Sequence, residues 1–268
     1  MSSVREISSP VACPVNALPQ IQKRLAAGRI PWFGPLLLVS ARSVLWLTLQ
    51  SLLALLFFAL HRPNPFRTAG DWWIVYGTLS DLCCLLGMRY FTRREGIRLR
   101  DLIGPIRMRW GRDILFGLGI LALSIPLFIA GGYLAAWVAY GSIAKAPLEF
   151  LWQRHTLPLW ATVYSLTVWW IIQSATEEMT YQGYALPRLE ALTGRTGIAF
   201  TIVGFWWALQ HCMIPFIPDW RYLAYRFVMM LPVLTMMMLV YLRIRRLSPL
   251  IVAHWSMDLA GAILTGIH

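Results

Sequence analysis

Seven stretches of mostly apolar residues constrain this chain more than any other feature of its sequence. A membrane-spanning helix needs about 20 such residues, and the stretches cover residues 34–60, 71–91, 113–140, 158–186, 196–214, 222–242 and 247–267. The composition agrees, because 58% of the 268 residues are hydrophobic and only 13% are charged. Soluble domains carry about 25% charged residues. The sequence therefore predicts an all-α transmembrane helix bundle of about seven spans and excludes a soluble globular enzyme.

The basic residues are distributed unevenly between the loops that connect these stretches. If the N-terminus lies inside, 17 of the 24 Lys and Arg residues fall on the cytoplasmic face, 5 on the opposite face and 2 inside spans. This asymmetry follows the positive-inside rule. We therefore expect an integral protein of the plasma or inner membrane with a cytoplasmic N-terminus, and we assign the net charge of +12 to topology and not to nucleic-acid binding. An eighth, short span within residues 141–157 is the alternative, and it would change the parity of the loops.

The chain divides into three predicted parts. Residues 1–30 form a polar cytoplasmic tail, residues 31–154 form N-terminal transmembrane helices, and residues 155–268 form a catalytic transmembrane core. Within the second part, residues 92–113 mix Arg with Ile, Leu, Met and Trp. Such a segment either lies on the cytoplasmic lipid surface, held by anionic headgroups, or forms a solvated loop.

Ionisable residues inside membrane spans are costly, by several kcal/mol, so each is a candidate for function. Three such residues are isolated, and we expect them to snorkel or to form structural ion pairs: Arg42, Asp81 and Arg226. Five others cluster in the last four spans: Glu177, Glu178, His211, His254 and Asp258. Because so many costly groups occur within about 80 residues of apolar sequence, the cluster predicts a functional site.

Helical spacing places these residues on shared faces. Residues four apart lie on one side of a helix, which pairs His254 with Asp258, Trp207 with His211, Glu177 with Tyr181 and Glu178 with Gln182. The fourth and fifth spans are joined by a turn near Gly194, and Glu177 and His211 each lie 17 residues from it. In an antiparallel hairpin the two residues should therefore sit at the same depth.

This set of side chains suits hydrolysis by an activated water. A buried glutamate can act as a general base on water, and histidine can orient that water, donate to an oxyanion or bind a metal. A zinc site formed by His211, His254 and Glu177 is conceivable. Nothing in the spacing demands a metal, so no cofactor is expected. A proton- or metal-dependent membrane enzyme or a transporter remains an alternative use of the same groups.

Three short motifs in order resemble the CPBP family, also called Abi. This family comprises type II CAAX prenyl proteases and bacteriocin-processing enzymes, which are intramembrane endopeptidases of the glutamate type. Its pattern is EExxxR, FxxxH and HxxxN or HxxxD. The corresponding residues here run from Glu177 to Gln182, from Trp207 to His211 and from His254 to Asp258. The resemblance covers roughly residues 155–268 and rests on all three motifs lying in predicted spans.

The resemblance implies roles for the site residues. Glu177 would activate the attacking water with His211 as its partner, His254 and Asp258 would support the oxyanion, and Glu178 would assist. Gln182, Tyr181 and Trp207 would be supporting residues. The substrate would be a CAAX-like, lipid-anchored or leader-bearing peptide near the membrane.

Two positions depart from the family pattern. Gln182 replaces the motif Arg, and Trp207 replaces the motif Phe. Loss of the Arg charge one turn from Glu178 should make that glutamate easier to protonate. The same change leaves open a catalytically silent scaffold or immunity protein of the same fold.

Overall fold

The computed structural model describes residues 15–104, 110–145 and 157–266, which are largely helical. The long helices are α2 (Phe33–Ala59), α4 (Trp73–Arg94), α5 (Trp110–Tyr140), α10 (Thr196–Cys212), α11 (Trp220–Ile244) and α12 (Ser248–Gly266). A further continuous helical passage comprises α7 (Leu159–Tyr164), a π-helix (Ser165–Trp169), α8 (Trp170–Glu178), a second π-helix (Met179–Ala185) and α9 (Leu186–Thr193). Within these residues the only β pairing is an isolated bridge between Met213 and Phe216. The predicted all-α fold class is confirmed.

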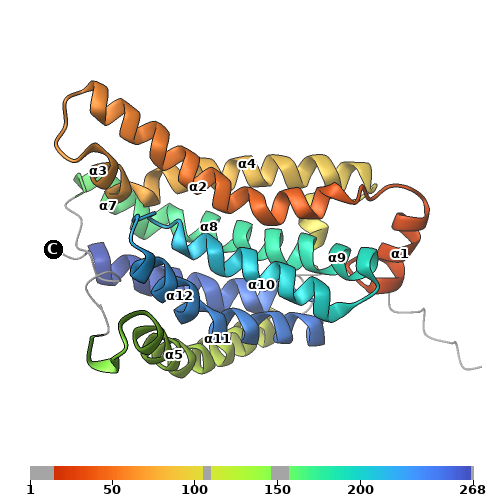
Figure 1. Cartoon of the computed structure of the whole chain (residues 1–268). Helices are drawn as coiled ribbons and strands as arrows, with labels where there is room; N and C mark the ends of the chain where they lie inside the picture. The colour runs from red at the N-terminus through yellow and green to blue at the C-terminus, as the bar shows by residue number, and fades with distance from the viewer. Residues whose placement is uncertain (1–14, 105–109, 146–156, 267–268) are drawn as a thin grey trace, which may run out of the picture.

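The long helices form a bundle in which α8 and α10 hold central positions (Figure 1). Helix α8 packs against α4 and α12, and α10 packs against α2 and α11. Helix α5 lies along α11 and α12 on the far side of the bundle from α2 and α4 (Figure 1). This arrangement brings one face each of α2, α4, α8, α10 and α12 toward a common interior.

Among the described residues, three helices are long and apolar enough to cross a membrane: α2, α5 and α11. The chain is therefore an integral membrane protein. The total of seven spans and the cytoplasmic N-terminus remain predictions. The region 141–157, where an eighth span was the alternative, lies mostly outside the described residues.

Close helix contacts depend on two glycines. A Cβ at Gly77 of α4 would collide with the ring of Trp46 on α2, and a Cβ at Gly131 of α5 would collide with the Met229 carbonyl of α11. The missing side chains let neighbouring backbones approach closely, as small residues do in membrane bundles. Gly77 thus sets the spacing of α2 and α4, the two N-terminal helices that face α8 and α10, and Gly131 sets the spacing of α5 and α11.

The polar tail is partly folded onto the bundle. Residues 1–14 are not among the described residues. Helix α1 (Leu18–Ala26) packs against α9, and the Asn16 side chain donates to the Gly183 carbonyl at 3.0 Å. Arg188 of α9 is fully buried and holds both carboxylate oxygens of Glu95 at 2.8 Å. Arg24 of α1 bonds the same carboxylate at 3.1 Å. Arg188, counted above as a loop charge, is thus a buried counter-ion at the end of the bundle.

Candidate active site

The five clustered ionisable residues come together in the interior of the bundle. Helix α8 ends with Glu177 and Glu178, α10 supplies His211 near its end, and α12 supplies His254 and Asp258. Each imidazole lies beside a different glutamate. Adjacent residues of a helix point about 100° apart, so the two glutamates face different partners.

Glu177 is 1% exposed and its carboxylate accepts several hydrogen bonds. Oε2 accepts from the amides of Gln173 at 2.8 Å and Gln210 at 2.6 Å, and from Arg42 at 3.4 Å. Oε1 accepts from the indole N–H of Trp207. These donors stabilise the ionised carboxylate and fix its orientation. Oε1 accepts one hydrogen bond and Oε2 accepts three. Oε1 is therefore the oxygen with a lone pair free to accept a proton.

His211 faces the less occupied oxygen of Glu177. Its Nε2 lies 3.7 Å from Glu177 Oε1, which brings together two residues that the hairpin count placed at one depth. Its Nδ1 lies 2.8 Å from the Trp207 carbonyl. A carbonyl can only accept, so Nδ1 carries the hydrogen and Nε2 of the neutral ring is an acceptor.

Glu178 and Asp258 flank the second imidazole. His254 Nδ1 lies 2.9 Å from Glu178 Oε1, and His254 Nε2 lies 3.7 Å from Asp258 Oδ1. Ser174, one turn before Glu178, donates to Asp258 Oδ2 at 2.6 Å. An ionised Glu178 can only accept, so Nδ1 donates to it, and a carboxylate beside each ring nitrogen suits a ring that donates from both nitrogens.

Arg42 and Asp81 belong to this site, although the sequence placed them outside it. Arg42 of α2 is fully buried and bonds Asp81 of α4 at 2.6 Å, which is the expected ion pair. It also donates to the side-chain Oε1 of Gln210 at 2.5 Å, to the side-chain Oε1 of Gln173 at 3.1 Å and to Glu177 Oε2 at 3.4 Å. The fixed positive charge beside the glutamate thus comes from α2. Arg226, in contrast, donates to the His211 and Ile214 carbonyls at the end of α10.

The supporting residues divide into two kinds. Tyr181 stacks on Trp207 with ring centroids 5.2 Å apart and an interplanar angle of 14°, so the two rings form one wall behind Glu177. Gln182 is fully buried, and neither of its amide atoms has a hydrogen-bond partner among the described residues. Gln182 therefore makes no hydrogen bond to Glu178, although the two residues are four apart and a π-helix begins between them at Met179.

The site is closed on one side and reaches the protein surface on the other. The glutamates are 0–1% exposed, whereas the side chains of His211, His254 and Asp258 are 14%, 11% and 18% exposed. A substrate that approaches from the surface would therefore meet the imidazoles and Asp258 first. Among the described residues, no group of three His, Cys, Asp or Glu side chains is placed to hold a metal ion, and the zinc set of His211, His254 and Glu177 does not form one.

The family described as type II CAAX prenyl endopeptidase Rce1-like matches residues 158–260. The resemblance predicted from the three motifs is confirmed over this segment. The Rce1-like segment contains both glutamates, both histidines and Asp258, but neither Arg42 nor Asp81. No curated protein and no solved structure matches the chain.

The Rce1-like family is one of membrane proteases of the CAAX type, which act on membrane-associated peptides. The three long apolar helices and the family therefore agree on a membrane-embedded protein. Besides Arg42 and Asp81, the sequence reasoning missed three site residues: Gln173, Ser174 and Gln210. All three lie next to or one turn from a motif residue, which is the signal that could have found them.

Proposed function

We propose that this chain is an active intramembrane endopeptidase that hydrolyses a peptide bond with a water activated by Glu177. The observation that supports this most strongly is the pairing of Glu177 Oε1 with His211 Nε2, because both atoms can accept from the same water. Their separation of 3.7 Å suits a water that makes two hydrogen bonds of about 2.8 Å. Such a water directs a lone pair away from both residues, toward a substrate carbonyl.

The reaction follows from these acceptors. As the water oxygen bonds the carbonyl carbon of the substrate, Glu177 Oε1 takes one proton from the water. The electron pair of the C=O double bond moves onto the carbonyl oxygen. Collapse of the tetrahedral intermediate restores the C=O bond and breaks the C–N bond. The departing nitrogen takes the proton from Glu177, which returns the carboxylate to its starting state.

His254 is the residue placed to stabilise the oxyanion. Its Nδ1–H is held by Glu178 at 2.9 Å, so Nε2–H is left to donate toward developing negative charge. Asp258, oriented by Ser174, keeps the ring positively charged from the other side. Glu178 and Asp258 are then positioning residues for His254, and Arg42, Gln173 and Gln210 are positioning residues for Glu177.

The substrate class follows from the family and from the exposed edge of the site. A CAAX-like, lipid-anchored or leader-bearing peptide would reach the imidazoles from the membrane surface on the cytoplasmic side. The bundle end that carries α1, α9 and the end of α4 (Figure 1) is the end that we assign to the cytoplasm. Its excess of arginine agrees with the positive-inside rule.

A comparison of protein termini in the native host tests this proposal. The wild type and Glu177→Ala are expressed at matched levels, and termini in the membrane fraction are profiled by mass spectrometry. We expect termini that appear only with the wild type and lie beside an apolar segment or a lipidated cysteine. They should disappear again in His211→Ala and persist in His61→Ala, an exposed histidine away from the site.

Identical termini in all four samples would contradict the protease. That result would favour the silent scaffold, or a transporter that uses the Glu/His cluster for protons. The transporter would then show substrate-coupled pH changes without a peptide product.

A further inference from the structure

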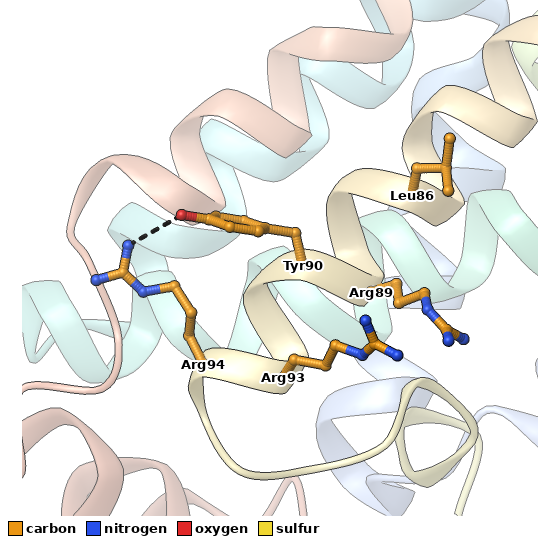
Figure 2. A pocket seen from close by; sticks show the side chains of 5 residues that line it. All are labelled: Leu86, Arg89, Tyr90, Arg93 and Arg94. Carbon is orange, nitrogen blue, oxygen red and sulfur yellow. Dashed lines mark hydrogen bonds between the residues drawn. The ribbon is translucent and has the colours of Figure 1, made fainter.

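Five exposed arginines gather where α4 ends and the chain turns toward α5. They are Arg89, Arg93, Arg94, Arg98 and Arg100. They line two adjoining hollows of about 470 Å³ and 520 Å³, to both of which Arg89 and Arg93 contribute. Figure 2 shows the first hollow, in which Leu86 and Tyr90 accompany three of the arginines. We name these five arginines, with Leu86 and Tyr90, the α4 basic patch.

The arginines of the patch are not neutralised within the described protein. None of the five makes an ion pair with a described carboxylate, since Glu95, the nearby buried acid, is taken by Arg24 and Arg188. Arg94 donates to the Tyr90 hydroxyl at 3.3 Å (Figure 2), which leaves its charge uncompensated. Arg89 and Arg93 are four residues apart on one helix face, where like charges repel. An anion bound between them would remove this repulsion.

An apolar strip on α4 leads directly into the patch. Leu79, Leu82, Leu86 and Tyr90 are 52%, 47%, 66% and 56% exposed, and their spacing of three, four and four residues keeps them on one face. The strip extends over 12 residues, whose 11 steps of 1.5 Å give a length of about 16 Å. One leaflet of hydrocarbon is about 15 Å thick, half of a bilayer core. The strip therefore has the length of one acyl chain and ends at the level of a phosphate.

We propose that the α4 basic patch binds the phosphate of an anionic phospholipid whose acyl chain lies along Leu79, Leu82 and Leu86. Arginine is suited to this ligand because its planar guanidinium bonds phosphate oxygens in a bidentate manner. The apolar strip favours a lipid over a free phosphate, which would gain nothing from it. The site lies on the outer face of α4 and its occupancy does not depend on the proposed proteolysis.

Native mass spectrometry of the full chain tests this site. The protein is equilibrated in mixed micelles with equal amounts of phosphatidylglycerol and phosphatidylcholine, and the lipids that remain bound are counted. The test variant is R89Q/R93Q/R98Q, and the control is R62Q/R67Q/R221Q, which removes the same charge from exposed arginines elsewhere. Matched elution and thermal unfolding show that each protein is folded.

The wild type and the control should retain phosphatidylglycerol in preference to phosphatidylcholine. The test variant should lose this preference by about fivefold for each arginine removed, the factor that one basic residue contributes at an anionic surface. A charge-conserving R89K/R93K/R98K protein should keep only part of the preference, because lysine retains the charge but cannot make the bidentate bonds. Equal losses in the test variant and the control would overturn the proposal, because they would mean that only net charge attracts the lipid.

The source of the phosphate is tested separately. Dihexanoyl phosphatidylglycerol and inorganic phosphate present the same charge without a long acyl chain, so neither should displace the long-chain lipid at equal concentration. Displacement by inorganic phosphate would contradict a lipid site. Because no step uses Glu177, failure here leaves the proposed protease unaffected, and an inactive Glu177→Ala protein should still bind the lipid.

Discussion

The Rce1-like segment and the N-terminal helices contribute different things to the same site. Residues 158–260 supply the two glutamates, the two histidines and Asp258. The helices α2 and α4, outside that segment, supply Arg42 and Asp81, a buried pair 2.6 Å apart. Groups that can move protons come from one half of the chain, and the fixed counter-charge comes from the other.

This difference explains how Glu177 can exist as an anion inside the bundle. A carboxylate in an apolar interior is costly unless it is paired and hydrogen-bonded. The Rce1-like segment supplies the hydrogen bonds of Gln173, Gln210 and Trp207, and α2 supplies Arg42. We therefore expect that damage to the segment removes chemistry, whereas damage to α2 removes the support that makes the chemistry possible.

Glu177→Gln should have the largest effect on activity. The amide keeps the size of the side chain but cannot take a proton from water, and a general base contributes roughly 10²- to 10⁴-fold to a rate. Cleavage of a substrate identified by its termini should fall by that factor. A rate within threefold of the wild type would assign the base to another residue.

Arg42→Met should have the largest effect on stability. It leaves Asp81 and Glu177 buried without their cation, and breaking a buried pair costs about 3–5 kcal/mol. Thermal unfolding in detergent should show this loss. The double variant Arg42→Met/Asp81→Leu should recover most of it, because a buried ion pair replaced by apolar side chains is often neutral.

The double variant separates folding from activity. If Arg42 also positions Glu177, the refolded double variant should remain poorly active. If the double variant recovered both stability and activity in full, Arg42 would be only a partner of Asp81. The whole site would then lie within the Rce1-like segment.

The sequence predicted the local part of the site better than its long-range part. The pairing of His254 with Asp258 needed only helical spacing, and that of Glu177 with His211 needed only equal distances from one turn. Arg42 and Asp81 are 135 and 96 residues from Glu177 in sequence. Nothing in their own spans indicates which of several helices they face. Because each is isolated in the sequence, the prediction gives them structural roles.

Trp207→Phe should have an intermediate effect. It restores the aromatic residue of the family motif and can keep the stack on Tyr181, but it removes the indole donor to Glu177. A hydrogen bond to a charged group contributes about 1.5–3 kcal/mol. We expect a loss of catalytic rate of about tenfold or more together with a lower unfolding temperature, because the buried carboxylate loses a donor and the smaller ring leaves a cavity. A rise in Michaelis constant alone would instead indicate a substrate-binding role.

Gln182→Leu should have the smallest effect on activity. Unlike the Arg42 variant, it should raise stability and not lower it. Both amide atoms are buried without a described partner, and such an unsatisfied group costs about 1–3 kcal/mol. The apolar replacement should therefore raise the unfolding temperature, while cleavage stays near the wild-type rate. A strong loss of cleavage would show that the amide contacts the substrate.

The remaining errors also come from structure that spacing does not encode. Gln182 makes no hydrogen bond to Glu178, and the Gly183 carbonyl in the π-helix after Glu178 accepts from Asn16 and Arg188. Composition alone made residues 1–30 a polar tail, whereas α1 docks on α9 through contacts that only the fold creates. The predicted spans, in contrast, agree closely with the long helices because hydrophobic length is a local property.

The most direct test of this account compares termini in host membranes that contain either the wild type or the folded double variant Arg42→Met/Asp81→Leu, at matched levels. All motif residues of the Rce1-like segment are intact in both. The account predicts that the wild-type-specific termini are lost or strongly reduced in the double variant, because Glu177 lacks its counter-ion. Undiminished termini from a folded double variant would contradict the claim that both halves of the chain form the active site.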